Sequence, residues 1–271
     1  MKGVCIVPEV IATRDIYNEN GVLLIAKGQK LTKRVRQKLW DGNIARKDQN
    51  EVNDKITVKD SVEQISDKFP QMAGNSLKDA SAIVSDIIFG SKSFPWWIYV
   101  CALSNYIDWM YTHSVDVALI STFIAIKSNC DQKTQSEICL GALLHDVGKL
   151  LIPKKILQKA GQLDEQEKLI VRQHCELGYD MAQEWNLSKE CMNIILQHHE
   201  RLDGSGYPYG ISGDEISEYA KIVMIADAFD AITSYRPYKQ LKSGSNGIRE
   251  LRNNGEKFAA SYVDTLAQCM G

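Results

Sequence analysis

The chain has 271 residues and a formal net charge of −2, with 24% charged residues. A nearly neutral chain without a basic block is a poor candidate for extended contact with DNA or RNA phosphates, so we expect a small-molecule partner. The seven cysteines are scattered without a CxxC pair, which argues against a disulfide framework and favours a reducing cytoplasm.

Residues 1–55 differ from the rest of the chain. Short apolar runs flank Asn20-Gly21, a dipeptide that favours a type I′ hairpin turn, and Thr32 can cap a helix that Gly42 ends. We therefore predict a small β-containing N-terminal module. Its role stays open between a packing or dimerising appendage and a ligand sensor, because it has no histidine and no phosphate-binding glycine loop.

From residue 56 onward the pattern is helical, which predicts a helical connector over residues 56–94 and a larger helical domain over residues 95–271. Helix-start signatures pair Ser61 with Gln64, Ser76 with Asp79, Thr134 with Glu137 and Asp164 with Glu167.

Two features between residues 83 and 126 belong to the expected core. An apolar stripe runs through Ile83, Val84, Ile87 and Ile88, and Pro95 can open a long helix toward His113. Burial inside the monomer is the first expectation for both, although the connector or the N-terminal module could also form a homodimer. The most apolar run, Val115 to Ile126, contains Asp116 and is too short to span a membrane, and no signal peptide opens the chain.

All five histidines lie in one internal stretch, at His113, His145, His174, His198 and His199. A lone histidine is more often a core or surface residue than a ligand, but three of these five lie in the pairs His145-Asp146 and His198-His199. Asp227 lies in the apolar run KIVMIADAFDAI, where an unpaired carboxylate would be costly to bury. Together these residue types indicate a hydrolytic metal site.

His145-Asp146 is expected to end a helix that begins after Thr134, because an apolar face precedes it and Gly148 follows. Lys149 comes four residues after His145. Its ammonium could bind a phosphate oxygen or protonate a leaving group, but a solvated lysine beyond a helix end explains it equally well.

Between Asn105 and Arg252 the chain resembles the HD-GYP family, a bacterial branch of the HD-domain metal-dependent phosphohydrolases. The resemblance is carried in order by YTHSVDVA, LLHDVGKLLIP, RQHCELG, HHERLDGSGYP and IADAFDAITSYRPYK. It implies an all-helical domain that holds divalent metals, usually iron or manganese, and hydrolyses cyclic di-GMP. Imidazole and carboxylate ligands also suit zinc and nickel, so the sequence leaves the native metal open.

Carried over position by position, the resemblance implies two metal sites that share one carboxylate. The first would use His113, His145, Asp146 and Asp227, and the second would use His174, His198, His199 and the bridging Asp146. Asp146 and Lys149 would be catalytic, and Lys149, Tyr207, Arg236 and Lys239 would contact substrate. Tyr207 could equally be a loop residue that packs against the fold, beside the turn-forming Gly204 and Gly206.

Two departures from the family pattern matter. Members with a third metal have a glutamate one helical turn before the first histidine, where this chain has Trp109, so we expect two metals. Asp108 is the remaining candidate for an extra ligand. The proline that often follows the third histidine is Cys175 here, a change that removes no ligand.

The expected function is hydrolysis of cyclic di-GMP to the linear dinucleotide pGpG, and possible onward cleavage to GMP is part of that expectation. One alternative keeps the metals and changes the substrate to another cyclic dinucleotide or phosphate ester, since fold and metals do not select the base. The other alternative is a scaffold that binds nucleotide or protein without turnover. None of the seven expected ligands is missing, which favours the enzyme.

Overall fold

The computed structural model describes residues 16–17, 23–25, 58–72, 74–91, 94–234 and 242–268. Beyond residue 57 these residues form α2 (Val58–Lys68), α3 (Asn75–Gly90), α4 (Trp97–Tyr106), α5 (Asp108–Lys127), α6 (Gln132–Leu144), α7 (Lys154–Leu157), α8 (Glu165–Arg172), α9 (His174–Glu184), α10 (Lys189–Gln197), α11 (Glu218–Thr233), α12 (Gly244–Asn253) and α13 (Ala260–Ala267). Short 3-10 helices are η1 (Pro70–Met72), η3 (Val147–Leu151) and η4 (Gly213–Glu215). The expected all-helical domain is confirmed over these residues.

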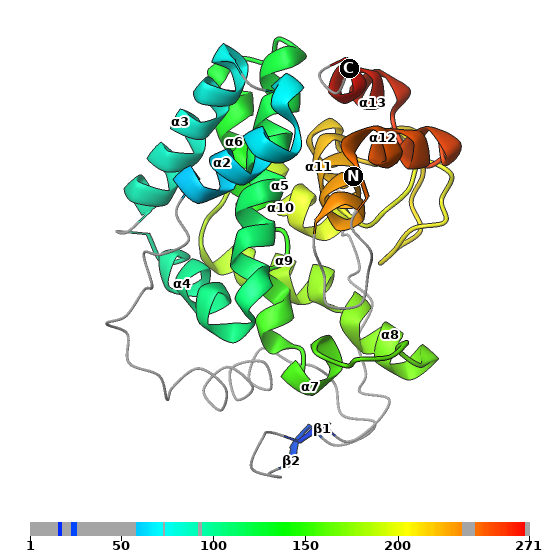
Figure 1. Cartoon of the computed structure of the whole chain (residues 1–271). Coiled ribbons are helices and arrows are strands. Elements are labelled where there is room, and N and C mark those ends of the chain that lie inside the picture. Colours follow the sequence, from blue (N-terminus) through cyan, green and yellow to red (C-terminus); the bar gives the residue numbers. More distant parts are fainter. Residues whose placement is uncertain are drawn as a thin grey trace, which may run out of the picture.

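Helix α5 lies at the centre of the fold, with α3 and α6 on one side and α11 on the other (Figure 1). It is apolar around most of its circumference, as a helix surrounded by others must be. Leu119 and Ile124 are fully buried, and Phe123 is 1% exposed. By length and composition the segment Trp109–Lys127 could cross a membrane, but 78% of its apolar 18-residue stretch is buried inside the fold. It serves here as a core helix.

The apolar stripe of α3 packs into the same core as α5. Val84 is fully buried and Ile88 is 6% exposed, while Ile83 and Ile87 are partly buried against the core. The expectation that the stripe packs within the monomer is confirmed. The domain boundaries expected at residues 55 and 94 remain predictions.

The long helix expected from Pro95 toward His113 is instead two helices. Helix α4 ends at Tyr106, and Ile107 takes an extended backbone with φ −144° and ψ 129° before α5 begins at Asp108. Ile107 itself is 3% exposed within the core, so packing of its side chain accompanies the break. No glycine or proline marks this point, which explains why the residue pattern predicts continuity.

In the N-terminal region, β1 (Ile16–Tyr17) and β2 (Leu23–Ile25) pair antiparallel, with Ile16 opposite Ile25. The expected turn at Asn20-Gly21 and the helix after Thr32 lie outside the described residues. The N-terminal module as a whole therefore stays a prediction.

Candidate metal centre

Five segments of the helical domain bring the seven predicted ligands together. Helix α5 carries His113, α9 begins with His174, and α11 carries Asp227, while the remaining four follow helix ends: His145 and Asp146 after α6, and His198 and His199 after α10. Five of the seven are at most 5% exposed, while Asp227 is 7% exposed and His199 is half-buried. Polar groups of this kind are rarely buried together without a shared partner.

Gly148 allows the two central segments to approach. A Cβ atom at this position would lie 2.0 Å from the backbone oxygen of His174 and 2.6 Å from the backbone nitrogen of Gly178. Only a residue without a side chain lets η3 pack this closely against the start of α9. The contact places Asp146 and His174, which flank it, on the same side of the centre.

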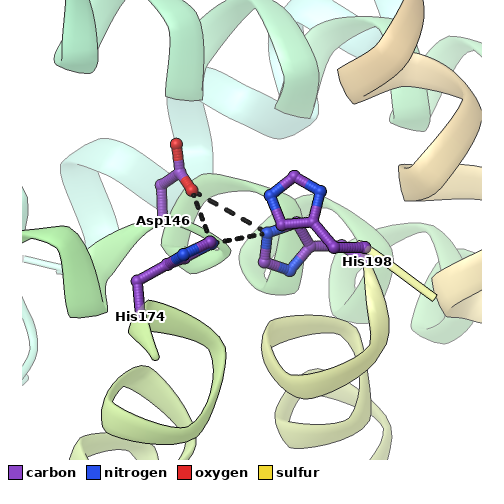
Figure 2. Close-up of side chains that lie close together, drawn as sticks. Asp146, His174 and His198 are labelled. Carbon is purple, nitrogen blue, oxygen red and sulfur yellow. Dashed lines mark hydrogen bonds and ion pairs between the residues drawn. The ribbon is translucent and has the colours of Figure 1, made fainter. Parts of the chain in front are cut away.

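Asp146 lies between two sets of histidines. Its Oδ2 is 3.4 Å from His145 Nε2 and 3.7 Å from His113 Nε2, whereas its Oδ1 is 3.3 Å from His174 Nε2 and 3.8 Å from His198 Nε2. Figure 2 shows the second set, with one oxygen of Asp146 facing both rings. Each oxygen therefore faces a different set, which is the arrangement that a bridging carboxylate requires.

Four of the histidine rings are oriented by their Nδ1 atoms. Nδ1 of His145, His174 and His198 lies 2.6, 2.7 and 3.0 Å from the carbonyl oxygens of Ala142, Val171 and Ile195. A carbonyl can only accept, so Nδ1 carries the proton and Nε2 presents a lone pair to the centre. His174 Nε2 and His198 Nε2 are only 3.2 Å apart, so their lone pairs converge on one point.

Asp230, which no sequence motif singled out, orients the fourth ring. Its Oδ2 is 2.6 Å from His113 Nδ1, and its Oδ1 accepts a hydrogen bond from Ser234 Oγ. Asp230 is 3% exposed and follows Asp227 by one helical turn on α11. That spacing, which puts both carboxylates on one helix face, is the signal that could have found it.

The described residues contain two groups whose ligand atoms all lie within 4.8 Å of one another: Asp146 with His174, His198 and His199, and His113 with His145 and Asp227. Two central atoms, His145 Nε2 and Asp146 Oδ1, are buried without a hydrogen-bond partner. Converging unprotonated nitrogens and an unpartnered carboxylate oxygen would be costly unless cations lay among them. The donor set therefore fits the two divalent metals expected from the sequence.

Burial and charge set the protonation states that metal binding requires. Burial lowers the pKa of His174 to about 4, with a further contribution from Lys149, and it also lowers the pKa values of His198 and His199. Burial alone would raise the pKa of Asp146, but Lys149 and the neighbouring histidines hold it well below its usual range. These histidines are neutral and this carboxylate is charged near pH 7.

Two of the four predicted substrate residues lie at the centre. Lys149 Nζ is 2.5 Å from Asp146 Oδ2 and 13% exposed, so it is not a solvated lysine beyond a helix end. The ring of Tyr207 lies 4.7 Å from that of His199. Burial, with nearby Cys175, Asp227 and Asp146, raises the pKa of Tyr207, so its hydroxyl keeps its proton. Arg236 and Lys239 lie outside the described residues.

Glu200 holds the loop that carries Tyr207. It is fully buried, and its Oε1 accepts a 2.8 Å hydrogen bond from the backbone N–H of Tyr209. A Cβ atom on Gly206 would lie 2.4 Å from the Glu200 Cα, so glycine is required where the loop returns over this residue. Tyr207 thus lies on a loop that packs against the fold, and its ring also faces the centre.

The two departures from the family pattern also lie here. The Trp109 ring is 6.2 Å from that of His113, and it supplies no oxygen ligand. Cys175 is buried, with its Sγ 3.5 Å from His174 Nε2. Among the described residues, Cys130, Cys139, Cys175 and Cys191 are free thiols.

Comparisons with known proteins agree with this geometry. A family model described as an HD domain matches residues 100–261. Cyclic di-GMP phosphodiesterase PA4108 of Pseudomonas aeruginosa is 37% identical over 165 residues, which are 60% of this chain and 40% of that protein. A cyclic di-GMP phosphodiesterase of Thermotoga maritima is 37% identical over 168 residues, which are 60% and 46% of the two chains.

A third relative has another substrate in its name. The 3'3'-cGAMP-specific phosphodiesterase 1 of Vibrio cholerae is 36% identical over 156 residues, which cover 56% of this chain and 35% of the relative. The matches thus span less than half the length of these curated relatives. Among solved structures, Bd1817, an HDG"Y"P protein from Bdellovibrio bacteriovorus, has a TM-score of 0.53 at 16% identity and covers 97% of this chain and 95% of its own. That likeness supports the fold.

Proposed function

The chain belongs to the HD domain family, and from this premise we propose that it is a metal-dependent phosphodiesterase that hydrolyses cyclic di-GMP to pGpG, with onward cleavage to GMP. The observation that carries the proposal is the shared carboxylate of Asp146, whose two oxygens face two sets of inward-pointing histidines. Phosphodiester hydrolysis by two metals needs such a bridged pair of sites. The names of the relatives add support for a cyclic dinucleotide substrate.

The first metal would be held by His113, His145, Asp146 and Asp227. The second would be held by His174, His198, His199 and the other oxygen of Asp146. We propose that the two metals are iron or manganese, because imidazole and carboxylate ligands suit both ions. When bound, two such cations activate water as the nucleophile and neutralise negative charge on the phosphate.

The remaining residues would act on the substrate. Lys149 reaches the centre as a cation and would bind the phosphate or protonate the leaving oxygen. The protonated hydroxyl of Tyr207 would donate a hydrogen bond to a substrate oxygen. Arg236 and Lys239 follow α11 and are proposed, on the resemblance alone, to hold phosphate or guanine.

A mixed cyclic dinucleotide is the second candidate substrate. The relatives named for 3'3'-cGAMP are 36–40% identical to this chain, much like those named for cyclic di-GMP. A scaffold that binds without turnover is less consistent with the complete ligand set. We place the protein in the cytoplasm, where its free thiols would stay reduced, and retain a homodimer through the N-terminal module or connector as a proposal.

One experiment tests metal and substrate together. The full chain is purified without oxygen, its iron and manganese are measured, and the same sample is assayed with cyclic di-GMP, 3'3'-cGAMP and bis(p-nitrophenyl) phosphate. The proposal expects about two metals per chain and fastest turnover of cyclic di-GMP. Turnover of the simple diester alone would refute the substrate, and a fully loaded protein that cleaves nothing would favour the scaffold.

A further inference from the structure

Arg172 opens the motif RQHCELG, in which only His174 was given a role, and it lies beside the centre. It is the last residue of α8, it is exposed, and its Cζ is 5.0 Å from the centroid of the Tyr207 ring. Only Gln173 separates it from His174, one of the proposed metal ligands. A guanidinium at this distance over an aromatic face makes a cation–π contact.

The tyrosine connects this cation with the metal centre. Its ring lies 4.7 Å from the His199 ring at an interplanar angle of 31°, so Arg172, Tyr207 and His199 form a series of neighbouring planar groups. The His199 side chain is 17% exposed, against at most 4% for the other four histidines. The series therefore begins where the centre meets solvent and places a positive charge at that opening.

The charge of Arg172 is not neutralised within the described part of the chain. No carboxylate there forms an ion pair with it: Glu165 on the same helix pairs with Lys168 at 2.7 Å, and Arg172 makes only a minor contribution to lowering the pKa of Glu165. An arginine stays charged at any physiological pH, and its ring contact restrains the guanidinium plane while leaving N–H donors for an anion. Among the described residues, the site thus has a cation that is held by the Tyr207 ring and is paired with no carboxylate.

We propose that Arg172 binds the second phosphate of the cyclic dinucleotide, the one that is not being cleaved. This inference rests on the proposed function. A cyclic dinucleotide carries two phosphodiesters, and the metals with Lys149 would neutralise the scissile one. Arg236 and Lys239, proposed above for phosphate or guanine, lie outside the described residues. The second phosphate still carries a negative charge. The closed ribose-phosphate ring of the dinucleotide keeps it close to the scissile phosphate, and so close to the metals. A guanidinium held at the opening on Tyr207 meets that requirement with paired hydrogen bonds.

The test compares two substrates that differ in the second phosphate. Arg172→Gln, Arg172→Lys and wild type are assayed with cyclic di-GMP and with bis(p-nitrophenyl) phosphate, which has one phosphate, and the metal content of each is measured. Arg249→Gln, which removes an exposed arginine from α12, is the matched control for net charge. We expect Arg172→Gln to raise KM for cyclic di-GMP about tenfold, the loss of one charge-assisted hydrogen bond.

The expected pattern has three parts: KM for the simple diester stays at the wild-type value, Arg172→Lys recovers only part of the loss, and metal content does not change. Equal effects on both substrates, or loss of metal, would show that Arg172 supports the fold and would overturn the inference. Unchanged KM for cyclic di-GMP would also overturn it while leaving the proposed function intact. A wild-type protein that cleaves only the simple diester would instead refute the proposed function itself.

Discussion

Asp146 links the two halves of the metal centre because each of its carboxylate oxygens faces a different set of histidines. Lys149 reaches the same carboxylate without being a ligand. The two residues should therefore respond differently to substitution, although they lie three positions apart and touch each other.

We predict that Asp146→Ala loses metal and hydrolysis together, since the repulsion between two cations is no longer compensated. Lys149→Ala should keep both metals but lose turnover of cyclic di-GMP. Metal analysis and turnover on the same preparations measure both outcomes. Wild-type turnover in Lys149→Ala would show that the lysine has no part in the chemistry.

Asp230 acts on the metal centre through another residue. Its Oδ2 lies 2.6 Å from His113 Nδ1 and fixes which ring nitrogen faces the centre. We predict that Asp230→Asn lowers metal affinity about 10- to 100-fold, the usual cost of losing such a partner. Asp264→Asn, which breaks the surface pair with Arg252, is the control. Competition with a chelator measures affinity, and equal affinities in the two variants would contradict the prediction.

At the scale of helices, one of the four predicted helix-start signatures is confirmed and three lie inside a helix. The capping box of Asp164 and Glu167 is present at the start of α8. The signature at Thr134 lies three residues too late, because Asp131 caps α6 and accepts a hydrogen bond from the Thr134 backbone N–H. The signatures at Ser61 and Ser76 lie inside α2 and α3. The break at Ile107 has no local sequence signal. An isoleucine between two apolar segments also fits the pattern of one continuous helix, so the residue type does not indicate the break.

The contact between η3 and α9 yields a prediction at the same scale. Gly148→Ala would drive a methyl group into the His174 carbonyl, 2.0 Å away, and would push His174 from Asp146. Because backbone must move, we expect a loss of about 3 kcal/mol or more in unfolding free energy, with loss of metal binding. Gly161→Ala, which has open space around its Cβ, is the control. Equal stability of the two variants in urea would contradict this account.

For the whole molecule, the ordered motifs were enough to predict the family and the convergence of seven side chains. Residues whose role depends on a neighbour were harder to predict. Asp230 matters because His113 lies against it, and Arg172 matters because Tyr207 lies beneath it. Single residue patterns do not encode such contacts between distant segments. Asp227 was found because an aspartate in an apolar run is already anomalous.

The buried histidines couple the stability of the whole molecule to pH. His174 has an ordinary pKa of 6.5 that burial lowers to about 4 in the folded chain, and the pKa values of His198 and His199 fall in the same direction. Between these two pH values the unfolded chain binds protons that the folded chain excludes. The unfolding free energy therefore decreases as pH falls through this range.

We predict that urea unfolding of the metal-free protein shows this loss between pH 6.5 and pH 4.5, and that stability is flat above pH 7.5. His174 alone accounts for ~3 kcal/mol over its full range, from 6.5 to about 4. The lowered pKa values of Asp146 and Asp227 act below this window, since an unfolded carboxylate takes up its proton only near pH 4. His174→Gln removes one titrating group and should flatten the profile of stability against pH.

Bound metal should steepen this profile. A cation binds only the neutral rings, so the stability that it adds is lost as protons compete for the same nitrogens. Constant stability of the metal-free chain from pH 6.5 to pH 4.5 would mean that the folded and unfolded chains take up protons equally, so that burial does not lower the pKa values of these rings, and it would contradict the prediction.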